Sequence, residues 1–563
     1  MVMQTNRTCL LLCLALVLAA CSDEESGGVS VDITVFHPQA KGIASFETLS
    51  RVRVAAVQRS SREVLADSSY TVESGKGSLP EIPFGRDLQI VVEGEDASGI
   101  PIVRGQSTPF DLLPGDDGLS VGVLTSTIGT FHRAATLFEE SDGTEDVLPV
   151  NFHFAEGRAG STMTRLRDGR VVVLGGASLT ADGQKSDGIP KDLGVGSVLD
   201  RAEIYNPAAG TFAPLPAMQF PRAFHTATLL DDGRILVVGG VGLFDGDLET
   251  VRPAELLNPS SGRWEEISTT LGPATGRAWH TATVRKRDGD VVLVGGRQLT
   301  DGNPTVLDTV EIFDISEGSF RTNPGDVAIS LPAARAEHQA VLLANGRGQG
   351  ADVLVIGGVD ADGVPQSDTW IVTNSNDPDR YEVASPSSLA LDTARTGHTA
   401  QRITPGSGTL IAVIGGFDAD GDALASIEII DTSAFNVVSG GRLADARGYH
   451  EAVELPFTRR LVIIGGTDED QLVGAAEILS FDESGVRYDG QPARGGMVRG
   501  RMLHGATLMS NGLILVAGGV GEDDGSFESL DEVELFNADD GSPAVLAGSG
   551  NNDNNGNNGD FLE

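Results

Sequence analysis

The chain has 563 residues, a hydrophobic content of 40% and a formal net charge of −40. That hydrophobic content suits a folded core and excludes wholesale disorder, and the length allows two or more domains. The negative charge argues against nucleic acid as a partner, because phosphate contacts need clustered Lys and Arg side chains. Cysteine occurs only at positions 9, 13 and 21, which excludes a disulfide framework, a thiol nucleophile and a cysteine-ligated metal in the rest of the chain.

Residues 1–20 are predicted to be a signal peptide. Their apolar run, residues 9–19, has the length of a signal h-region and is too short to span a bilayer. The run ends in Leu18-Ala19-Ala20-Cys21, which resembles the bacterial lipobox. We therefore expect Cys21 to become the lipidated first residue of the mature chain. The alternative is an ordinary secretory signal cleaved at the same place.

The expected lipid anchor makes the membrane a partner and predicts a location in the bacterial cell envelope. A diacylated and N-acylated cysteine inserts several acyl chains, so the anchoring would be firm. Ser22, rather than Asp, follows Cys21. By resemblance to Gram-negative sorting, this favours the outer membrane, with residues 21–28 as a short polar tether.

Residues 29–128 are predicted to form a small β-sandwich. Apolar and polar residues alternate over 29–36, 51–57 and, more loosely, 88–92, and turn signals separate these runs. Six or seven short strands at this spacing suggest an antiparallel sandwich, similar to the immunoglobulin-like or transthyretin-like modules of envelope proteins. Such a resemblance implies no activity. The module is expected to be a spacer, and the alternative is a small binding module.

Residues 129–156 are predicted to connect this module to the rest of the chain. Gly129-Thr130-Phe131 echoes Gly210-Thr211-Phe212, which ends one of the repeats described below. The last repeat ends without an aromatic residue, and an unclosed ring would leave a free strand edge. We therefore predict that residues 129–134 supply the outer strand of the last repeat.

A short apolar run that ends in two glycines occurs seven times, with spacings of 64, 56, 62, 58, 50 and 53 residues between the first glycines. Repeats of this period are typical of propellers and arrays. The apolar runs are continuous rather than alternating, so both faces of these strands should be buried. The glycine pairs should allow dihedral angles or close approaches that a Cβ would forbid. The pairs are Gly175 and Gly176, Gly239 and Gly240, Gly295 and Gly296, Gly357 and Gly358, Gly415 and Gly416, Gly465 and Gly466, and Gly518 and Gly519.

Before each apolar run stands the motif Arg-x-x-His-x-Ala, except that the first copy has Arg158 followed by Ser161. We expect the Arg and His of a repeat to hydrogen-bond within that repeat, in part with its Glu. The alternative is a ring of imidazoles that binds a metal; residues used identically around a ring favour the structural role, so no metal or cofactor is expected. The copies are Arg222 and His225, Arg277 and His280, Arg335 and His338, Arg395 and His398, Arg447 and His450, and Arg501 and His504.

The repeats continue with a variable acidic loop, a strand that carries Glu, which repeat 4 replaces with Trp370, and in most copies a last strand led by an aromatic residue. This pattern resembles the kelch repeat, the propeller family that includes the galactose-oxidase middle domain. The resemblance implies an all-β fold: a seven-bladed kelch-type β-propeller over residues 157–548, preceded by the small β-sandwich. Residues 549–563 are rich in Asn and Gly and are expected to be disordered.

The acidic loops contain Asp-x-Asp-Gly segments, such as residues 360–363 and 418–421. This spacing can ligate Ca²⁺, but the bidentate Glu of a calcium loop is missing. Turn chemistry is therefore the preferred interpretation.

No short catalytic motif is present. Galactose-oxidase chemistry needs a Tyr–Cys thioether, for which the predicted mature chain has no cysteine beyond Cys21. The first hypothesis is a lipid-anchored, non-enzymatic scaffold that binds a protein or a glycan at the cell envelope through its loops, with those of repeats 1 and 2 the longest. The alternative is a carbohydrate-acting enzyme, epimerase- or lyase-like, which would need a non-repeated cluster of carboxylates, Arg or Tyr at the mouth of the propeller channel. A purely structural role is the third possibility.

Overall fold

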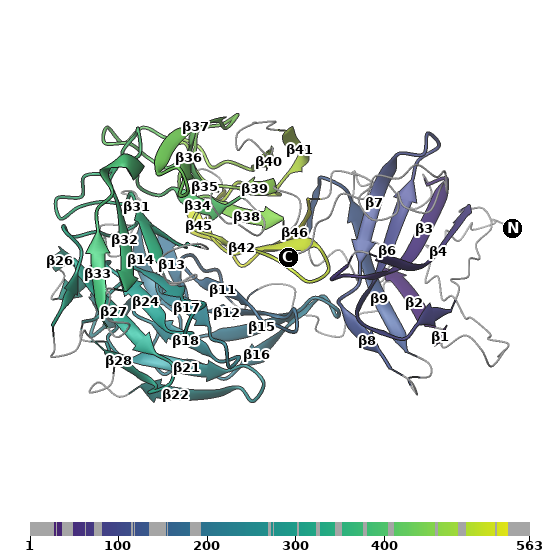
Figure 1. The fold of residues 1–563 in the computed structure, drawn as a ribbon, viewed down its shortest axis with the longest axis horizontal. Coiled ribbons are helices and arrows are strands. Elements are labelled where there is room, and N and C mark those ends of the chain that lie inside the picture. Colours follow the sequence, from purple (N-terminus) through teal and green to yellow (C-terminus); the bar gives the residue numbers. More distant parts are fainter. Residues whose placement is uncertain are drawn as a thin grey trace, which may run out of the picture. The chain divides into compact units, whose positions relative to one another are not determined.

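In the computed structural model, the described residues form β-strands and one short 3-10 helix, η4 (Ser387–Leu389) (Figure 1). It divides into unit 1, residues 1–128 with 539–563, and unit 2, residues 129–538. Within its described part, no helix has the length and apolar character needed to cross a bilayer. The structure describes residues 28–29, 31–36, 49–61, 63–71, 81–113, 116, 119–133, 154, 156–180, 193–267, 272–273, 275–300, 303–321, 327–343, 352–374, 380–403, 410–455, 460–481, 491–523 and 526–538.

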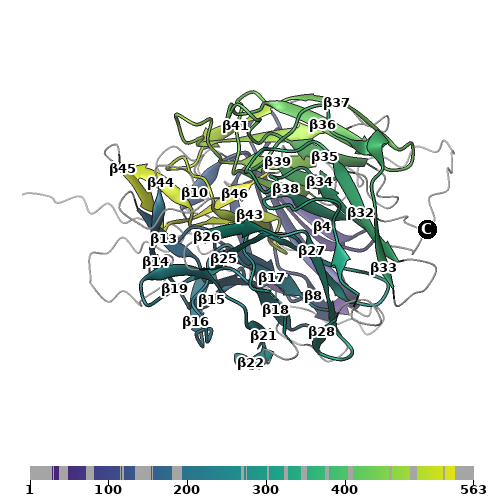
Figure 2. The same ribbon diagram turned by 90° about the vertical axis from the view of Figure 1, so that its left-hand side faces the viewer.

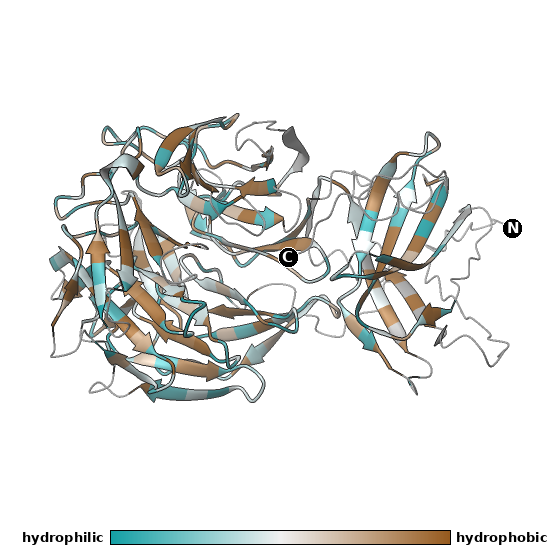
Figure 3. Cartoon of the chain, in the orientation of Figure 1, coloured by the Kyte–Doolittle hydropathy of each residue, from teal (hydrophilic) through white to brown (hydrophobic). Residues whose placement is uncertain are grey.

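Unit 1 contains a seven-stranded sheet with the order β2-β9-β7-β6-β3-β4, in which β8 also pairs with β6. Alternate residues of its strands form one core, which includes Val54, Ile90 and Val123. Figure 3 shows the matching alternation of brown and teal along these strands. The strands are β2 (Asp32–Phe36), β3 (Arg51–Gln58), β4 (Glu63–Thr71), β6 (Gly85–Glu95), β7 (Pro101–Gln106), β8 (Phe110–Leu112) and β9 (Ser120–Thr127), and β1 (Gly28–Val29) pairs with β5 (Ile82–Pro83).

The sheet of unit 1 is not wholly antiparallel, which corrects the sequence-based expectation. Strand β2 runs parallel to β9, with Ile33 opposite Val121 and Val35 opposite Val123. Alternation in the sequence shows which residues of a strand face the core. It does not show whether the neighbouring strand is parallel or antiparallel, because side chains alternate between the two faces of the sheet in both arrangements.

Unit 2 contains seven sheets of four antiparallel main strands among its described residues. Sheet 3 has one further short strand, β29 (Ile329–Ser330), which pairs with β27. From first to last strand the sheets are: sheet 1, β11 (Thr162–Arg165), β12 (Val171–Leu174), β15 (Ala202–Asn206) and β16 (Thr211–Leu215); sheet 2, β17 (Thr226–Leu229), β18 (Ile235–Val238), β21 (Ala254–Asn258) and β22 (Arg263–Ile267); sheet 3, β23 (Thr281–Val284), β24 (Val291–Val294), β27 (Thr309–Asp314) and β28 (Ser319–Arg321); sheet 4, β30 (Gln339–Leu342), β31 (Val353–Ile356), β32 (Thr369–Asn374) and β33 (Tyr381–Ala384); sheet 5, β34 (Thr399–Arg402), β35 (Leu410–Ile414), β36 (Ser426–Asp431) and β37 (Asn436–Arg442); sheet 6, β38 (Glu451–Leu455), β39 (Arg460–Ile464), β40 (Ala475–Ser480) and β41 (Gln491–Gly496); sheet 7, β42 (Gly505–Leu508), β43 (Leu513–Ala517), β46 (Val533–Asn537) and β10 (Phe131–Arg133).

The second strand of each sheet is buried on both faces, as its continuous apolar run predicts. Val172 and Leu174 of β12 pack in one core cluster with Val237 of sheet 2, whereas Leu236 and Val238, on the other face of β18, pack with sheet 3. Each strand therefore contributes to two cores, one on either side of its sheet. This environment explains why the runs are uninterrupted by polar residues.

The first strands of the seven sheets contact one another in sequence: β11 with β17, then β23, β30, β34, β38 and β42, and β42 contacts β11 again. In Figure 2 the sheets follow one another around a circle, with the last strands β22, β28, β33, β37 and β41 toward its edge. Sheet 7 is completed by β10, in which Phe131 pairs with Phe536 of β46. This pairing confirms that a segment within residues 129–134 supplies the outer strand of the last repeat.

Candidate functional site

The glycine pairs stand at the end of the second strands, where consecutive repeats approach most closely. Both glycines of all seven pairs have positive φ angles, for example 68° at Gly239 and 91° at Gly240. A Cβ on Gly239 would collide with the carbonyl oxygen of Arg277 and would lie 2.8 Å from Cε1 of His280, and both residues belong to the next repeat. A Cβ on Gly240 would instead lie 2.7 Å from the carbonyl oxygen of Ala223 in its own repeat. The predicted need for glycine is confirmed, and its cause is the Arg–His segment of the following repeat for the first glycine and of the same repeat for the second.

Replacing Gly239 by Ala should lower the free energy of unfolding by about 3 kcal/mol or more, because strain at positive φ adds to a collision with fixed backbone. Gly233 is the matched control: its φ is 86°, but a Cβ there would meet nothing within 4 Å. Gly233→Ala should cost only about 1 kcal/mol. Urea unfolding of the two variants measures the difference, and equal losses would contradict this account.

The repeated arginines are buried and bind their own repeat, as predicted. Arg222 lies 2.5 Å from Glu255 of the same sheet, and both side chains have 0% exposure. Its Nη1 also donates to the carbonyl oxygen of Gly239, the first glycine of that repeat. Burial lowers the pKa of Arg222, and the Glu255 charge opposes that shift. The equivalent pairs are Arg158 with Glu203, Arg277 with Glu311, Arg335 with Asp368, Arg395 with Glu428, Arg447 with Glu477 and Arg501 with Glu534.

The Nε2 atoms of four repeated histidines bond to the preceding repeat, which corrects the prediction that these side chains bond only within their own repeat. Nε2 of His280 lies 2.9 Å from Oγ1 of Thr226, which belongs to the preceding repeat. The same bond joins His225 to Thr162, His338 to Thr281 and His450 to Thr399. Burial, assisted by the neighbouring arginine, lowers the pKa of His225 to about 3. The imidazoles are therefore neutral links between consecutive sheets at pH 7.

The histidine links are broken at two positions. Nε2 of His398 and Nε2 of His504 are buried and make no hydrogen bond to a threonine of the preceding repeat. In the preceding repeats the threonine position is occupied by Gln339 and Glu451, respectively. Burial raises the pKa of Glu451 to about 8. Glu451 therefore places a carboxyl group, rather than a threonine hydroxyl, at the junction between sheets 6 and 7.

The residue immediately before each repeated histidine, or before Ser161 in the first repeat, has a positive φ. We call these the ring residues: Gly160, Phe224, Trp279, Glu337, Gly397, Tyr449 and Leu503, with φ angles between 51° and 63°. Their main chains bond in sequence, from the N–H of Phe224 to the carbonyl of Gly160 and from the N–H of Trp279 to the carbonyl of Phe224, and so around most of the circle. Strained backbone at non-glycine residues is often found at functional sites. The sequence did not predict this position, at which only Gly160 and Gly397 indicate a positive φ.

Two charged side chains break the repeat pattern here: Glu337, which is itself a ring residue, and Arg297, which follows the glycine pair of repeat 3. Nη2 of Arg297 lies 2.8 Å from Oε1 of Glu337, and their side chains are only 6% and 9% exposed. Oγ1 of Thr396 donates to the other carboxylate oxygen of Glu337. Burial and the Glu337 charge raise the pKa of Tyr449. The enzyme hypothesis requires a non-repeated cluster of this composition, so Arg297, Glu337 and Tyr449 are the candidate site of that hypothesis.

The connections between second and third strands are unequal around the circle. Repeats 1, 2, 3 and 7 carry hairpins, which lie side by side in Figure 2 and share one apolar cluster with the ring residues Phe224 and Trp279. The loops of repeats 1 and 2, predicted to be the longest, form two of these hairpins. In repeat 1, residues 181–192 between the two strands of the hairpin lie outside the described part. The hairpins are β13 (Ala177–Thr180) with β14 (Gly194–Val198), β19 (Val241–Phe244) with β20 (Asp247–Thr250), β25 (Arg297–Thr300) with β26 (Asn303–Val306), and β44 (Val520–Asp523) with β45 (Ser526–Ser529).

Repeats 4, 5 and 6 carry short acidic turns instead. Oδ1 of Asp360 accepts hydrogen bonds from the N–H groups of Asp362 and Val364, and Asp418 does the same in the next repeat. These bonds confirm turn chemistry as the role of the first aspartate. Within the described residues, no group of three or more His, Cys, Asp or Glu side chains is placed to hold a metal ion. We call the ring residues together with the four hairpins and three turns the hairpin face of unit 2.

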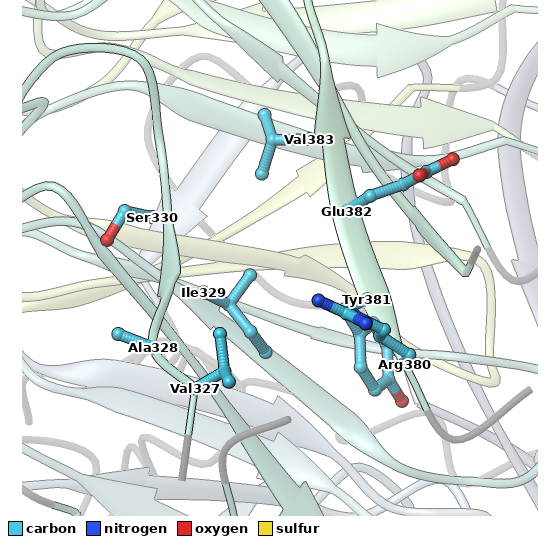
Figure 4. Close-up of a pocket in the computed structure, with 8 residues that line it drawn as sticks. All are labelled: Val327, Ala328, Ile329, Ser330, Arg380, Tyr381, Glu382 and Val383. Carbon is cyan, nitrogen blue, oxygen red and sulfur yellow. The ribbon is translucent and has the colours of Figure 1, made fainter. Parts of the chain in front are cut away.

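A pocket of about 440 Å³ lies away from the hairpin face, between β29 and β33 (Figure 4). It is lined in part by Ile329, Tyr381 and Glu382. Tyr381 is buried in the core between sheets 3 and 4, and Arg285 packs 4.8 Å from the centre of its ring. The pocket is therefore a gap between two packed sheets, and we do not assign a function to it.

One known protein with a similar sequence agrees with the repeat pattern. Over 163 residues the chain is 33% identical to the F-box/kelch-repeat protein At1g51550 of Arabidopsis thaliana, and the match covers 27% of this chain. The repeats are similar to kelch repeats. The chain spans about a third (31%) of the length of that relative. The solved structure entitled "Structure of YjhT" covers 60% of this chain and 99% of its own, with 15% identity and a TM-score of 0.44. No family model matches the chain.

Proposed function

We propose that the chain is a lipid-anchored cell-envelope protein: a small β-sandwich followed by a seven-bladed kelch-type propeller that acts as a non-enzymatic binding scaffold for a protein or a glycan. The observation that carries this proposal is the set of ring residues. Five side-chain types occupy one strained and otherwise equivalent backbone position: Phe, Trp, Glu, Tyr and Leu, with Gly in the remaining two repeats. Positions that serve only the fold keep the same residue in almost every repeat, as the Arg and Gly positions do. Variable side chains on a rigid frame are typical of recognition surfaces.

The carbohydrate-acting enzyme stays the second candidate because Arg297, Glu337 and Tyr449 form a non-repeated cluster. Two features favour binding over catalysis. Both carboxylate oxygens of Glu337 are already engaged, by Arg297 and Thr396, and the ion pair is more than nine-tenths buried. A general acid or base has to reach the proton that it transfers.

The proposed anchor and location rest on the motif that ends in Cys21, which lies outside the described residues. Cys21→Ala should move the protein from the membrane fraction to the soluble fraction and abolish incorporation of labelled palmitate. Labelling of the variant equal to that of the wild type would refute the anchor and leave the scaffold proposal untouched.

Affinity capture tests the scaffold directly. The immobilised protein should retain a near-stoichiometric partner from detergent-solubilised envelope, and a Trp279→Leu and Tyr449→Leu double variant should lose it. The matched control is Tyr381→Leu, which changes a tyrosine at the distant pocket. A partner retained equally by the double variant, or no retained protein or glycan, would contradict the proposal.

A further inference from the structure

We propose that the hairpin face of unit 2 docks a basic polypeptide segment rich in Arg and Lys. The inference rests on the proposed scaffold function and names the partner of that same surface. Its two supports are the charge of the seven connections and the aromatic character of the ring residues.

The hairpins and turns of this face are almost purely acidic. Within the described residues of the four hairpins and three turns, Arg297 is the single basic side chain, and it pairs with Glu337. Two further arginines follow the hairpins on the same connections: Arg201, which pairs with Glu156, and Arg252, whose Nε donates to the carbonyl oxygen of Pro273. The acidic side chains on the same connections are Asp245, Asp247, Glu249, Asp360, Asp362, Asp418, Asp420, Asp422, Asp468, Glu469, Asp470, Glu522 and Glu528.

In two turns at the opposite end of the sheets, between the first and second strands, the aspartates have arginine partners. There, Asp168 pairs with Arg170 and Asp232 with Arg234, each at 2.7 Å. Within the described residues, the acidic turns of repeats 4 to 6 have no arginine partner of this kind, although Glu528 of the repeat 7 hairpin pairs with Arg499. A partner of opposite charge would be attracted to that face over the range of the screening length, about 8 Å at physiological salt.

Three carboxylates of the face are free to meet such a partner. Asp362, Asp420 and Asp470 are the third residues of their turns, and all three are exposed. Their N–H groups bond to the first aspartate of the turn, whereas their own carboxylates make no hydrogen bond or ion pair within the described residues. The carboxylate of the first aspartate stabilises the turn, whereas that of the third is available to a partner.

The ring residues favour arginine in the partner. Phe224 and Trp279 stack with ring centroids 5.0 Å apart, and both are only half-buried. Tyr449 lies in the same ring of main-chain bonds, and its pKa responds to the charges of both Glu337 and Arg297. A guanidinium over such rings gains about 0.5–2 kcal/mol, depending on how far it is desolvated. A basic segment lying across the face would thus meet aromatic rings on one side and the acidic turns of repeats 4 to 6 on the other.

Fluorescence anisotropy with the full-length protein and labelled nonapeptides tests the proposal. Nona-arginine should bind, nona-glutamate and a Gly-Ser nonapeptide should not, and affinity should fall as salt is raised from about 50 to about 200 mM. The triple variant Asp362→Asn, Asp420→Asn, Asp470→Asn should weaken nona-arginine binding about tenfold, since each exposed charge pair is worth roughly 0.5 kcal/mol. Trp279→Leu should weaken it further.

A second triple variant removes the same charge elsewhere: Glu266→Gln, Glu317→Gln, Glu382→Gln. These side chains are exposed and lie outside the hairpin face. The proposal is overturned if this control weakens binding as much as the aspartate variant, or if nona-arginine does not bind at the lower salt concentration. A captured envelope partner without a basic segment at its contact would overturn the proposal and leave the scaffold function standing.

Discussion

Replacing Arg222 by Met should lower the free energy of unfolding by about 3–5 kcal/mol, because the change strands a buried carboxylate. Arg222 and Glu255 are both fully buried, and their 2.5 Å ion pair is the main compensation for the desolvated charges. The double variant Arg222→Met, Glu255→Leu should lose less than the single variant, since no unpaired charge then remains. Urea unfolding of both variants measures this order.

The matched control for Arg222 is an exposed pair of the same chemistry. Arg167 lies 3.3 Å from Asp231, with side chains 64% and 68% exposed. Arg167→Met should change stability by less than about 0.5 kcal/mol. If Arg167→Met costs as much as Arg222→Met, or the double variant is the least stable of the three, the role assigned to the buried pairs is wrong.

Glu451→Thr should stabilise the protein at about pH 8–9 and have little effect near pH 4. Burial raises the pKa of Glu451 from an ordinary 4.5 to about 8. Between these values the unfolded chain releases the proton and the folded chain holds it, so the free energy of unfolding falls as pH rises. Removing the carboxyl should recover on the order of 2–4 kcal/mol above pH 8.

The introduced threonine would also restore a link that other repeats have. Thr399 binds Nε2 of His450 at 2.9 Å, and a threonine hydroxyl in place of the Glu451 carboxyl would be offered to His504 in the same way. Thermal unfolding across the acid-to-alkaline range measures the effect, and Glu382→Gln is the control because Glu382 is exposed. We expect the variant to gain stability over the wild type as pH rises above about 5. If the wild type instead gains stability over Glu451→Thr in this range, the raised pKa assigned to Glu451 is wrong.

The repeated strands of unit 2 could be predicted from the sequence because the same residue types recur at the same positions in most repeats. Continuous apolar runs predicted strands buried on both faces, and the glycine pairs predicted positive φ. The pairing of β10 with β46 followed from an echo of three residues, Gly129-Thr130-Phe131. Each of these features has a local cause, so a pattern in the chain can show it.

The site could not be predicted in the same way. The histidine partner lies one repeat earlier, and a spacing pattern does not show which repeats touch. Arg297 and Glu337 are 40 residues apart and meet only because consecutive repeats bring their connections together. The ring position varies in residue type, so a search for repeated residues does not find it, and this variation is the observation on which the proposed binding role rests.

Site-specific photo-crosslinking in the intact cell envelope tests the central claim most directly. A benzophenone side chain at Asp362, on the hairpin face, should form a crosslink to a discrete partner. The same group at Glu266, on the outer strand β22, should form none. Crosslinks from Glu266 alone, or the same products from both positions, would contradict the assignment of the hairpin face as the binding surface.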